Sequence, residues 1–464
     1  MDVLLVLLPL AFLILVAYRG FNVILFAPLA ALLAVLLANP AYVLPFFSGV
    51  FLDKLAGFIK LYFPVFLLGA VLGKLIEMAG YAKSISTAVI AIIGKNRAML
   101  AVVLVGAILS YGGVSLFVVV FAIYPFAAEL FKASDIPKRL IPATIGLGSF
   151  TFTMDALPGT PQIQNIIPTT FFNTDAWAAP WLGICGSIFI FSIGMFYLQW
   201  QRNLAIQTGE GYGKNHLNEP ERRAETTLPS VGIAVLPLLV VTVFNKVFTK
   251  LIPQYYGKTF DFTSLGMEGI PPIEISKLTA VWAVEGALVL GILTVLVFAF
   301  RAIKTGFTAG LNLAIGGALL ATLNTASEYG FGAVIAALPG FKVVSTGIAS
   351  LFKDPLVNEA VTTTTLAGIT GSGSGGLSIS LALMSKTYLE QATQLGIDPE
   401  VLHRVAAMAC GGMDSLPHNG ALITLLAVTG LTHKQAYKDI FILTLVKTAA
   451  VFFVIALYYG FGIV

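Results

Sequence analysis

The sequence predicts an all-α polytopic membrane protein made of an inverted repeat of two five-helix halves. Hydrophobic residues make up 57% of the 464 residues and charged residues only 11%, whereas a soluble domain carries roughly 25% charged residues. Apolar segments recur at roughly 17–25 residues, the length that an α-helix needs to cross a bilayer. Two near-matching peptides, MDALPGT at Met154–Thr160 and MDSLPHN at Met413–Asn419, interrupt such segments about 260 residues apart.

About 10 spanning helices are predicted in order along the chain. Their approximate ranges are 3–18, 21–38, 56–80, 140–172, 179–200, 228–247, 277–300, 310–338, 401–430 and 438–462. The first follows Asp2 and not a basic segment, so we interpret it as a retained helix and not as a cleaved signal peptide. Proline, glycine and aspartate interrupt 140–172 and 401–430. Each is therefore predicted to be a broken helix whose freed backbone groups are covered by protein or line a cavity.

Two further apolar stretches, at about 97–131 and about 357–390, are each too long for one crossing. Each has a Gly/Ser cluster near its middle, SYGGVS at Ser110–Ser115 and TGSGSGGLS at Thr370–Ser378. The simplest interpretation is a re-entrant helical hairpin with its tip inside the membrane. Two short spans joined by a surface turn are the alternative.

The basic residues indicate how the chain is oriented. If the N-terminus is outside and both hairpins return to the side they enter from, the inside loops hold 15 lysines and arginines and the outside loops hold 6. This bias agrees with the positive-inside rule and gives the two halves opposite orientations. The predicted organisation is a first repeat at 1–200, a cytoplasmic linker at 201–227 and a second repeat at 228–464, with an external loop at about 248–276. The match of Gly112–Ser115 to Gly375–Ser378 supports the duplication.

The breaks and the hairpin tips carry the predicted chemistry. The N-terminal end of a half-helix carries partial positive charge and binds anions, and glycine lets the backbone approach a ligand closely. Two tips and two breaks that converge near the midplane would suit a small carboxylate with hydroxyl groups. The candidate substrate-binding residues are Ser110, Gly112, Gly113, Ser115, Gly159, Thr160, Gln162, Asn165, Ser372, Ser374, Gly375, Ser415 and Asn419.

Candidates for proton coupling are the ionisable residues inside the spans, because charges at membrane depth are costly and mark function. Asp155 and Asp414 occupy equivalent positions. Each either takes up and releases a proton or caps the half-helix after its break. His418 lies at the second break, and Glu328 has polar neighbours in NTASEYGFG, so both are further candidates. We expect His403 and His433 to be helix-end or loop residues.

The two breaks resemble one known family. FTMDALPGTPQIQN and GGMDSLPHNGALITLLAVTGLTHKQAYKDI are similar to the gluconate:proton symporter (GntP) family, and most of all to its branch of D-β-hydroxybutyrate permeases. The turn Gly159-Thr160-Pro161 also resembles the break of a wider ion-transporter superfamily that includes dicarboxylate/sodium symporters. The resemblance covers essentially the whole chain. It implies a homodimer, a fixed scaffold, a mobile transport domain and elevator-type alternating access.

One departure from the family pattern concerns the first break. Gluconate transporters of the family have a Pro-Pro-His-Pro-Gly-type cluster there, whereas this chain has Asp155-Ala156-Leu157-Pro158-Gly159. This difference favours a monocarboxylate smaller than a sugar acid.

The function expected from these observations is secondary active transport, a proton-coupled symport of a small organic acid anion that is gluconate-like or hydroxybutyrate-like. A sodium-coupled carboxylate symporter of the same fold and an anion facilitator or channel are the alternatives. We expect no enzyme activity, because the inverted repeat and the lack of a Gly-Asp dipeptide argue against an intramembrane aspartyl protease. Cys185 and Cys410 are interpreted as core residues, so no metal site or cofactor is predicted. The expected surroundings are the lipid bilayer of the inner (cytoplasmic) membrane, with no nucleic acid partner.

Overall fold

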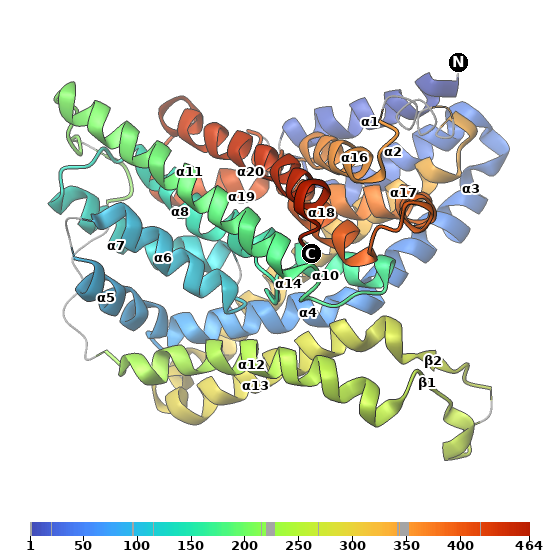
Figure 1. Cartoon of the computed structure of the whole chain (residues 1–464), viewed down its shortest axis with the longest axis horizontal. Helices are drawn as coiled ribbons and strands as arrows, with labels where there is room; N and C mark the ends of the chain where they lie inside the picture. The colour runs from blue at the N-terminus through green and yellow to red at the C-terminus, as the bar shows by residue number, and fades with distance from the viewer. Residues whose placement is uncertain are drawn as a thin grey trace.

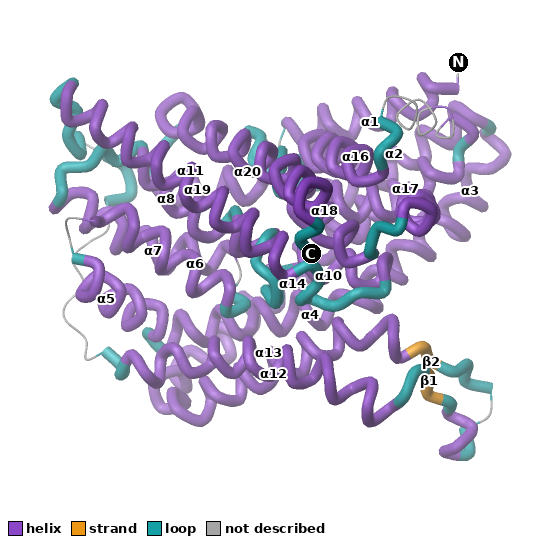
Figure 2. Tube along the Cα trace, viewed as in Figure 1, coloured by secondary structure: helices purple, strands orange, loops and turns teal. Residues whose placement is uncertain are grey.

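The structure, a computed structural model, is almost entirely helical (Figures 1 and 2). It describes residues 2–19, 21–94, 97–114, 116–214, 216–219, 228–267, 269–340, 343, 352–417 and 419–464. Its strands in these ranges, β1 (Thr259–Phe260) and β2 (Ile273–Glu274), form one short antiparallel hairpin at an edge of the molecule (Figure 2). The predicted all-α class is therefore confirmed.

The helices before the linker are given first. They are α1 (Asp2–Tyr18), α2 (Val23–Ala38), η1 (Pro40–Tyr42), α3 (Val43–Phe46), the π-helix η2 (Phe47–Leu52), α4 (Asp53–Met78), α5 (Tyr81–Ile93), α6 (Ala98–Tyr111), α7 (Leu116–Ala133), α8 (Leu140–Ser149), α9 (Phe152–Asp155), α10 (Ile163–Phe172) and α11 (Pro180–Gln207).

The helices after the linker include long helices, the pair α16–α17 and the interrupted pair α18–α19. They are α12 (Val231–Tyr256), η4 (Phe262–Leu265), α13 (Ile275–Ile303), η5 (Lys304–Gly306), α14 (Phe307–Ala337), α16 (Pro355–Thr370), α17 (Gly373–Leu395), α18 (Pro399–Cys410), α19 (Gly420–Thr429) and α20 (His433–Phe461).

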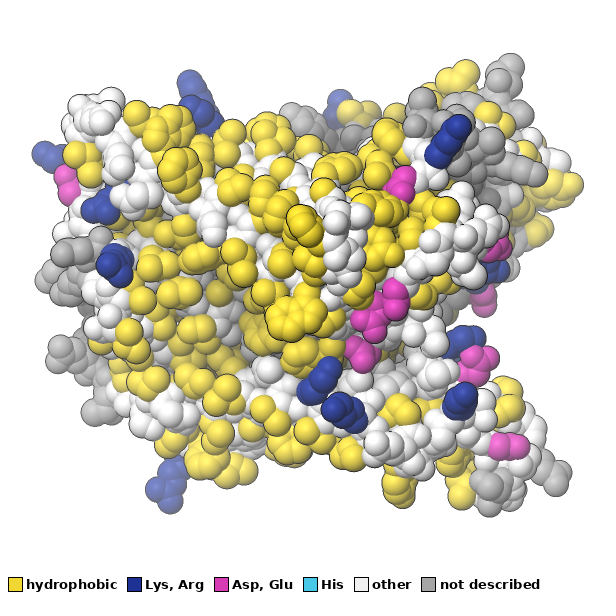
Figure 3. All heavy atoms as spheres, viewed as in Figure 1, with side chains coloured by type: hydrophobic (Ala, Val, Ile, Leu, Met, Phe, Trp, Pro, Cys, Tyr) yellow, Lys and Arg dark blue, Asp and Glu magenta, His cyan; other side chains and the backbone are white. Residues whose placement is uncertain are grey.

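Several helices have the length and composition of membrane spans. In the described part of the chain, five helical stretches are long and apolar enough to cross a membrane. One of them, Ile275–Ile335, contains both α13 and nearly all of α14. On the face of the molecule shown in Figure 3, hydrophobic side chains cover a broad middle zone. Such a surface is expected where lipid surrounds the protein.

Some predicted boundaries differ from the observed ones. α11 continues to Gln207, so the first seven residues of the predicted linker are helical. α12 continues to Tyr256 and takes up the start of the predicted external loop, whose remainder forms the β hairpin. α5 was not predicted, because Lys83, Ser84 and Ser86 interrupt the apolar pattern of this short helix.

The two hairpins approach the centre from opposite ends of the molecule. In Figure 1, α6 and α7 enter from the left, the end at which the linker lies, whereas α16 and α17 enter from the right. α6 packs on α7, and α16 packs on α17. The two broken helices lie side by side, with α10 against α18 and α8 against α19. The breaks and the hairpin tips are therefore brought into one central region.

A second group of helices lies along one side of this region. α4 packs on both α13 and α14, and α12 packs on α13. The group touches the first broken helix through polar contacts: the Asn245 side-chain amide donates to the Gly159 carbonyl (3.2 Å), and the Tyr62 hydroxyl donates to the Ile167 carbonyl (3.3 Å). We call α4, α12, α13 and α14 the support layer.

The described part of the linker is fixed to the helix ends by ion pairs. Lys138 donates to the Glu219 carboxylate (2.8 Å), and Arg139, just before α8, pairs with Glu210 of the linker (2.8 Å) and with Asp439 of α20 (2.8 Å). Burial alone would raise the pKa of Glu219, but hydrogen bonds from Lys138 and Tyr212 outweigh burial and hold that pKa below its usual range. The linker therefore rests against the same helices that carry the breaks.

Candidate functional site

The first predicted break is a real interruption of a helix. α8 ends at Ser149, α9 is one turn that ends at Asp155, and α10 begins at Ile163. The hydroxyls of Ser149 and Thr151 donate to carbonyls four residues earlier (2.7 and 2.6 Å) and so help to satisfy the end of α8. Gly159 has a φ of +79°, and a Cβ there would lie 2.5 Å from the Trp177 ring. Only glycine fits this turn without strain.

The tip of the first hairpin is attached to the first break. The Gln162 side-chain amide donates to the carbonyls of Ser110 (2.8 Å) and Val114 (3.3 Å). The Tyr111 hydroxyl donates to the Pro158 carbonyl (2.8 Å). Gly113 has a φ of +86°, and a Cβ there would lie 3.2 Å from Pro161. The structure thus brings Ser110, Gly113 and Gln162 together, and their contact with a substrate stays a prediction.

The tip of the second hairpin is attached to the second break in a similar way. The Asn419 side-chain amide donates to the Gly371 carbonyl (2.7 Å), and its carbonyl oxygen accepts from the Leu422 amide (2.8 Å). Asn419 is therefore the N-cap of α19. Gln162 occupies the N-cap position of α10 without a capping hydrogen bond. Neither Asp155 nor Asp414 caps the helix after its break, so the capping interpretation was wrong.

A buried ion cluster joins the two breaks. Lys447 Nζ of α20 lies 3.1 Å from Asp414 Oδ1, 3.6 Å from Asp155 Oδ2 and 2.8 Å from the Phe150 carbonyl oxygen. The side chains of Lys447 and Asp155 are 2% and 1% exposed, and that of Asp414 is 9% exposed. We call Asp155, Lys447 and Asp414 the central cluster. It contains one residue from each break, Asp155 and Asp414, and one from the last helix, Lys447.

Two glycines make room for the carboxylates of this cluster. A Cβ at Gly411 would lie 1.9 Å from Asp155 Oδ2 and 2.9 Å from Lys447 Nζ. A Cβ at Gly373, the first residue of α17, would lie 3.1 Å from Asp414 Oδ2. Asp414 is thus held at the N-terminal end of α17, where a helix stabilises negative charge. The second break and the second hairpin tip therefore both shape the environment of the aspartates.

Sequence reasoning missed Lys447, although the signal was present. Lys447 stands in the apolar run FILTLVKTAAVFFV, and an ammonium group at membrane depth indicates a functional or paired residue. Its hydrogen-bond partners lie 33 and 297 residues away in the sequence. Only the fold could identify them.

A second buried polar group lies beside the first break and was also missed. The Arg404 guanidinium donates to the Ala178 carbonyl (2.7 Å) and to Asn165 Oδ1 (3.0 Å). His403 Nε2 lies 3.2 Å from the same Asn165 oxygen, and its Nδ1 lies 2.6 Å from the Thr174 hydroxyl. His403 is completely buried within α18, so its prediction as a helix-end or loop residue was wrong. His433 is the first residue of α20, as expected.

Asn165 has its polar atoms engaged inside the protein. Its amide nitrogen donates to the carbonyls of Thr160 and Ala176, both at 2.9 Å. Thr160 and Asn165 are fully buried. In this conformation they hold the loop after the first break in place, and their predicted contact with substrate stays a prediction.

Glu328 approaches the second hairpin from the support layer. A Cβ at Gly375 would lie 1.7 Å from Glu328 Oε2, and the Thr325 and Ser374 hydroxyls lie 3.3 Å apart. The Ser372 side chain accepts from the Gly375 amide (3.1 Å) and is the N-cap of α17. Glu328 is 3% exposed. The structure therefore places Glu328, Ser372, Ser374 and Gly375 at one tip.

Three further site residues need separate mention. Gly112 packs on the support layer, where a Cβ would lie 2.4 Å from Leu238 of α12. Ser115 and His418, both predicted site residues, lie outside the described residues.

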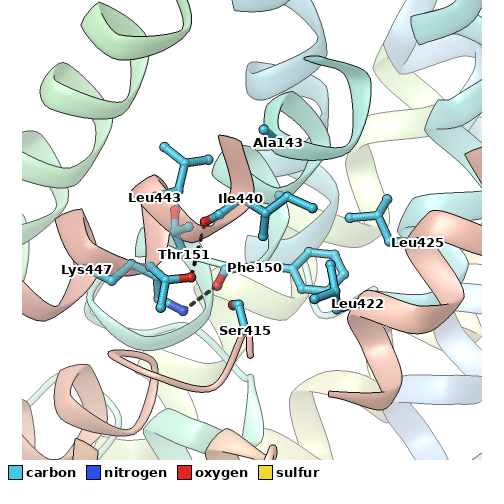
Figure 4. A pocket seen from close by; sticks show the side chains of 11 residues that line it. Ala143, Phe150, Thr151, Ser415, Leu422, Leu425, Ile440, Leu443 and Lys447 are labelled. Atoms are coloured by element: carbon cyan, nitrogen blue, oxygen red, sulfur yellow. Dashed lines mark hydrogen bonds between the residues drawn. The ribbon is translucent and has the colours of Figure 1, made fainter. Parts of the chain in front are cut away.

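A narrow pocket, with room for about one water molecule in this conformation, ends at the central cluster (Figure 4). Lys447, Ser415 and Thr151 line it together with Phe150, and Figure 4 shows the Lys447 ammonium and the Ser415 hydroxyl beside the Phe150 carbonyl. The remaining lining residues are mostly apolar and come from α8, α19 and α20: Ala143, Gly146, Leu422, Leu425, Ile440, Leu443 and Thr444. The pocket lies on the linker side of Lys447, since α8 begins beside Arg139, the partner of Glu210.

The fold and the site define a class of protein. Helices of membrane length, two broken helices and two hairpin tips that meet them are the architecture of a secondary transporter. Comparisons with known proteins agree. Residues 3–393 match the family described as GntP family permease, and the chain belongs to this family.

The relatives are transporters whose descriptions name no substrate. The chain is 57% identical to the uncharacterized transporter YxjC of Bacillus subtilis over the full length of both proteins. It is 24% identical to an uncharacterized permease of Haemophilus influenzae, over 70% of this chain and 65% of that protein. The crystal structure of the YdaH transporter of Alcanivorax borkumensis, titled as having an unusual topology, has a similar fold at a TM-score of 0.51, with 14% identity and 88% of each chain covered.

Proposed function

We propose that this permease is a proton-coupled symporter of a small organic acid anion, gluconate-like or hydroxybutyrate-like. The observation that carries the proposal is the central cluster, which places two carboxylates and one ammonium in a buried position where both breaks meet. Buried charges cost several kcal/mol each unless they are paired. Adding or removing one proton changes the net charge of the buried cluster. It therefore strongly changes the free energy of the conformation that contains the cluster, which is what proton coupling requires.

The coupling role is assigned to the central cluster first and to Glu328 second. Asp155 and Asp414 share one Lys447 ammonium, so the three groups together carry one excess negative charge when all are ionised. Protonation of either carboxylate would remove that excess. Glu328 is buried at the tip of the second hairpin, where its proton state would affect the contact between α14 and α17. His418 remains a candidate from the sequence alone.

The substrate would bind where the predicted polar groups converge. The hydroxyls and backbone groups at both hairpin tips and both breaks suit a carboxylate with hydroxyl groups. The pocket beside the central cluster offers the Lys447 ammonium and the hydroxyls of Ser415, Thr151 and Thr444 within an otherwise mostly aliphatic wall. This composition fits a small monocarboxylate.

We propose that transport follows an elevator-type alternating access within a homodimer. The hairpins and breaks form one closely hydrogen-bonded group. The support layer packs on that group mainly through α14 against α17, and it adds polar contacts such as Asn245 with Gly159 and Thr325 with Ser374. The support layer would be the fixed scaffold. Hairpins that enter from opposite ends support an inverted repeat, with the linker end in the cytoplasm and the N-terminus outside (Figure 1).

A sodium-coupled symporter of the same fold is the second candidate. The Phe150 carbonyl and the two aspartates are oxygen ligands of a kind that cations bind. The Lys447 ammonium already contacts these oxygens, which favours protons over sodium. An aspartyl protease mechanism is disfavoured for the same reason, since Lys447 pairs with the carboxylates that would have to share a proton.

The test is uptake into proteoliposomes of labelled gluconate, 3-hydroxybutyrate, lactate and citrate. Each substrate is driven in turn by a proton gradient alone and by a sodium gradient alone. We expect accumulation of one monocarboxylate with the proton gradient alone. Accumulation with sodium alone would support the second candidate, and equilibration without accumulation would identify a facilitator.

A further inference from the structure

We propose that Lys447 is the binding group for the substrate carboxylate, and that Asp414 is the counter-ion which the substrate replaces. On this proposal the proton is taken up by Asp414, which then releases Lys447 and Ser415 to the substrate. The inference rests on the proposed function and assigns two roles within it.

The position of Lys447 is the first argument. Its ammonium has three hydrogen-bond donors, and it lines the pocket at the end where the polar side chains gather (Figure 4). It donates to the Phe150 carbonyl (2.8 Å) and to Asp414 Oδ1 (3.1 Å). The contact with Asp155 Oδ2 is longer, at 3.6 Å. Loss of Asp414 as an acceptor would therefore free a donor next to the pocket.

The hydrogen bond of Ser415 is the second argument. The Ser415 hydroxyl lines the same pocket and donates to Asp414 Oδ1 (2.8 Å). The one oxygen of Asp414 thus occupies both polar groups that a carboxylate in the pocket would use. A proton on Asp414 weakens both interactions, because a neutral carboxyl is a poorer acceptor than a carboxylate. No residue that lines the pocket donates a hydrogen bond to Asp155, whose contact with Lys447 is the 3.6 Å ion pair.

Charge balance is the third argument. When ionised, Asp155, Asp414 and Lys447 carry a formal charge of about −1 together. One proton on Asp414 and one monocarboxylate on Lys447 leave that sum unchanged. Substrate without the proton would add a second uncompensated negative charge in a buried place, which is strongly disfavoured. The exchange therefore couples one proton to one carboxylate at this site.

The other titratable groups around Lys447 do not replace Asp414. Arg404 of α18 is directed to Asn165 Oδ1 and to the carbonyls of Ala178 and Asp155. The Cys410 thiol donates to the Ala407 carbonyl (3.0 Å). Asp155 stays paired with Lys447 while the substrate is bound. The pocket wall is otherwise mostly aliphatic, so the substrate class is a carboxylate on a short chain with few hydroxyls.

The experiment compares binding of 3-hydroxybutyrate by the purified full-length protein and its variants. Calorimetry in buffers of different ionisation enthalpy counts the protons taken up on binding. We expect the wild type to take up about one proton per ligand, and D414N, which mimics the protonated aspartate, to bind with no proton uptake and little dependence on pH. D414N/K447M should bind on the order of tenfold to a hundredfold more weakly than D414N, since it lacks one charge-assisted hydrogen bond.

A matched control uses the same change on the same helix. K438M replaces an exposed lysine near the start of α20, and it should leave binding and proton uptake as in the wild type. If D414N keeps proton uptake, or if D414N/K447M binds as tightly as D414N, the inference is overturned while the proposed symport stands. If the wild type neither binds 3-hydroxybutyrate nor transports any acid of the uptake panel, the proposed function fails as well.

Discussion

Gly411→Ala tests whether stability and transport depend on the close approach of the two breaks. The backbone at Gly411 has a φ of −77° and a ψ of −12°, which any residue adopts. The substitution therefore adds only a methyl group. That methyl carbon would lie 1.9 Å from Asp155 Oδ2, 2.8 Å from Lys447 Cε and 2.9 Å from Lys447 Nζ. Both groups are enclosed, so at least one must move.

The size of the effect follows from the displacement. Restoring a normal contact moves the carboxylate by roughly 1.5 Å, which weakens its attraction to Lys447 by about 1 kcal/mol at an effective dielectric constant of about 20. Overpacking of a filled core costs about 1–3 kcal/mol more. We expect a free energy of unfolding lowered by about 2–4 kcal/mol, and proton-driven uptake reduced by at least about tenfold because the cluster no longer forms.

The assay is thermal melting and proteoliposome uptake of the same preparations. Gly57→Ala on α4 is the control, because a Cβ at Gly57 would meet nothing within 4 Å. This control should melt at the wild-type temperature or slightly above it, since alanine favours the helix. If Gly411→Ala melts and transports like Gly57→Ala, neither stability nor transport depends on the close approach of the two breaks. The reasoning about the central cluster is then refuted.

Three further predictions concern the parts around the cluster. Gly148→Ala should lower the free energy of unfolding by about 2–4 kcal/mol or prevent folding, because its Cβ would lie 2.3 Å from a backbone carbonyl oxygen of α6. The control is Gly146→Ala, whose Cβ would meet nothing within 4 Å, and it should leave the melting temperature unchanged. Gln162→Ala should lower stability by about 1–3 kcal/mol and slow uptake, because it removes the amide that donates to the tip carbonyls of Ser110 and Val114. Melting that is unchanged would contradict the role of the amide. The pKa of Glu219 is lowered in the folded protein, so its contribution to linker docking is present above the unfolded value of 4.5 and is lost as the pH falls through the folded value. The protection factors for hydrogen exchange of residues 208–214, taken relative to the intrinsic exchange rate at each pH, should therefore fall on acidification, and Lys138→Ala should remove this pH effect.

The class of fold could be predicted because hydrophobic length dominates the sequence of a membrane protein. The long spans, both breaks and both hairpin stretches follow from runs of apolar residues and from the glycine, proline and serine that interrupt them. α5 was missed, since its polar residues face other protein segments and conceal a short helix from a hydropathy argument. Helix ends such as Gln207 and Tyr256 lie beyond the apolar core, where hydropathy no longer specifies them.

The candidate site could be predicted only in part. Asp155 and Asp414 stand out as carboxylates in apolar segments, and the structure brings both to the same ammonium. The identity of that partner could not be predicted, because Lys447 is distant in sequence and packs there only through the fold. Of the two roles left open for the aspartates, capping is excluded for Asp414, since Asn419 lies closer to the same helix end and caps it.

A buried carboxylate outside the predicted site shows the same limit. Glu359 of α16 is completely buried, and neither of its carboxylate oxygens has a hydrogen-bond partner within the described ranges. The sequence PLVNEAVTTTT places it beside polar residues, so it did not stand out as a charge in an apolar run. Burial depends on packing from other helices, which the sequence does not reveal.

The most direct test of proton coupling through the central cluster is to follow the pH inside proteoliposomes with a trapped dye. In this assay 3-hydroxybutyrate flows in down its own gradient, sodium is absent and the membrane potential is clamped. The account predicts that protons enter with the substrate and acidify the interior in the wild type, and that Asp414→Asn lets substrate enter without this acidification. Substrate entry into wild-type vesicles with no change of internal pH, or entry that requires sodium, would contradict proton coupling through the central cluster.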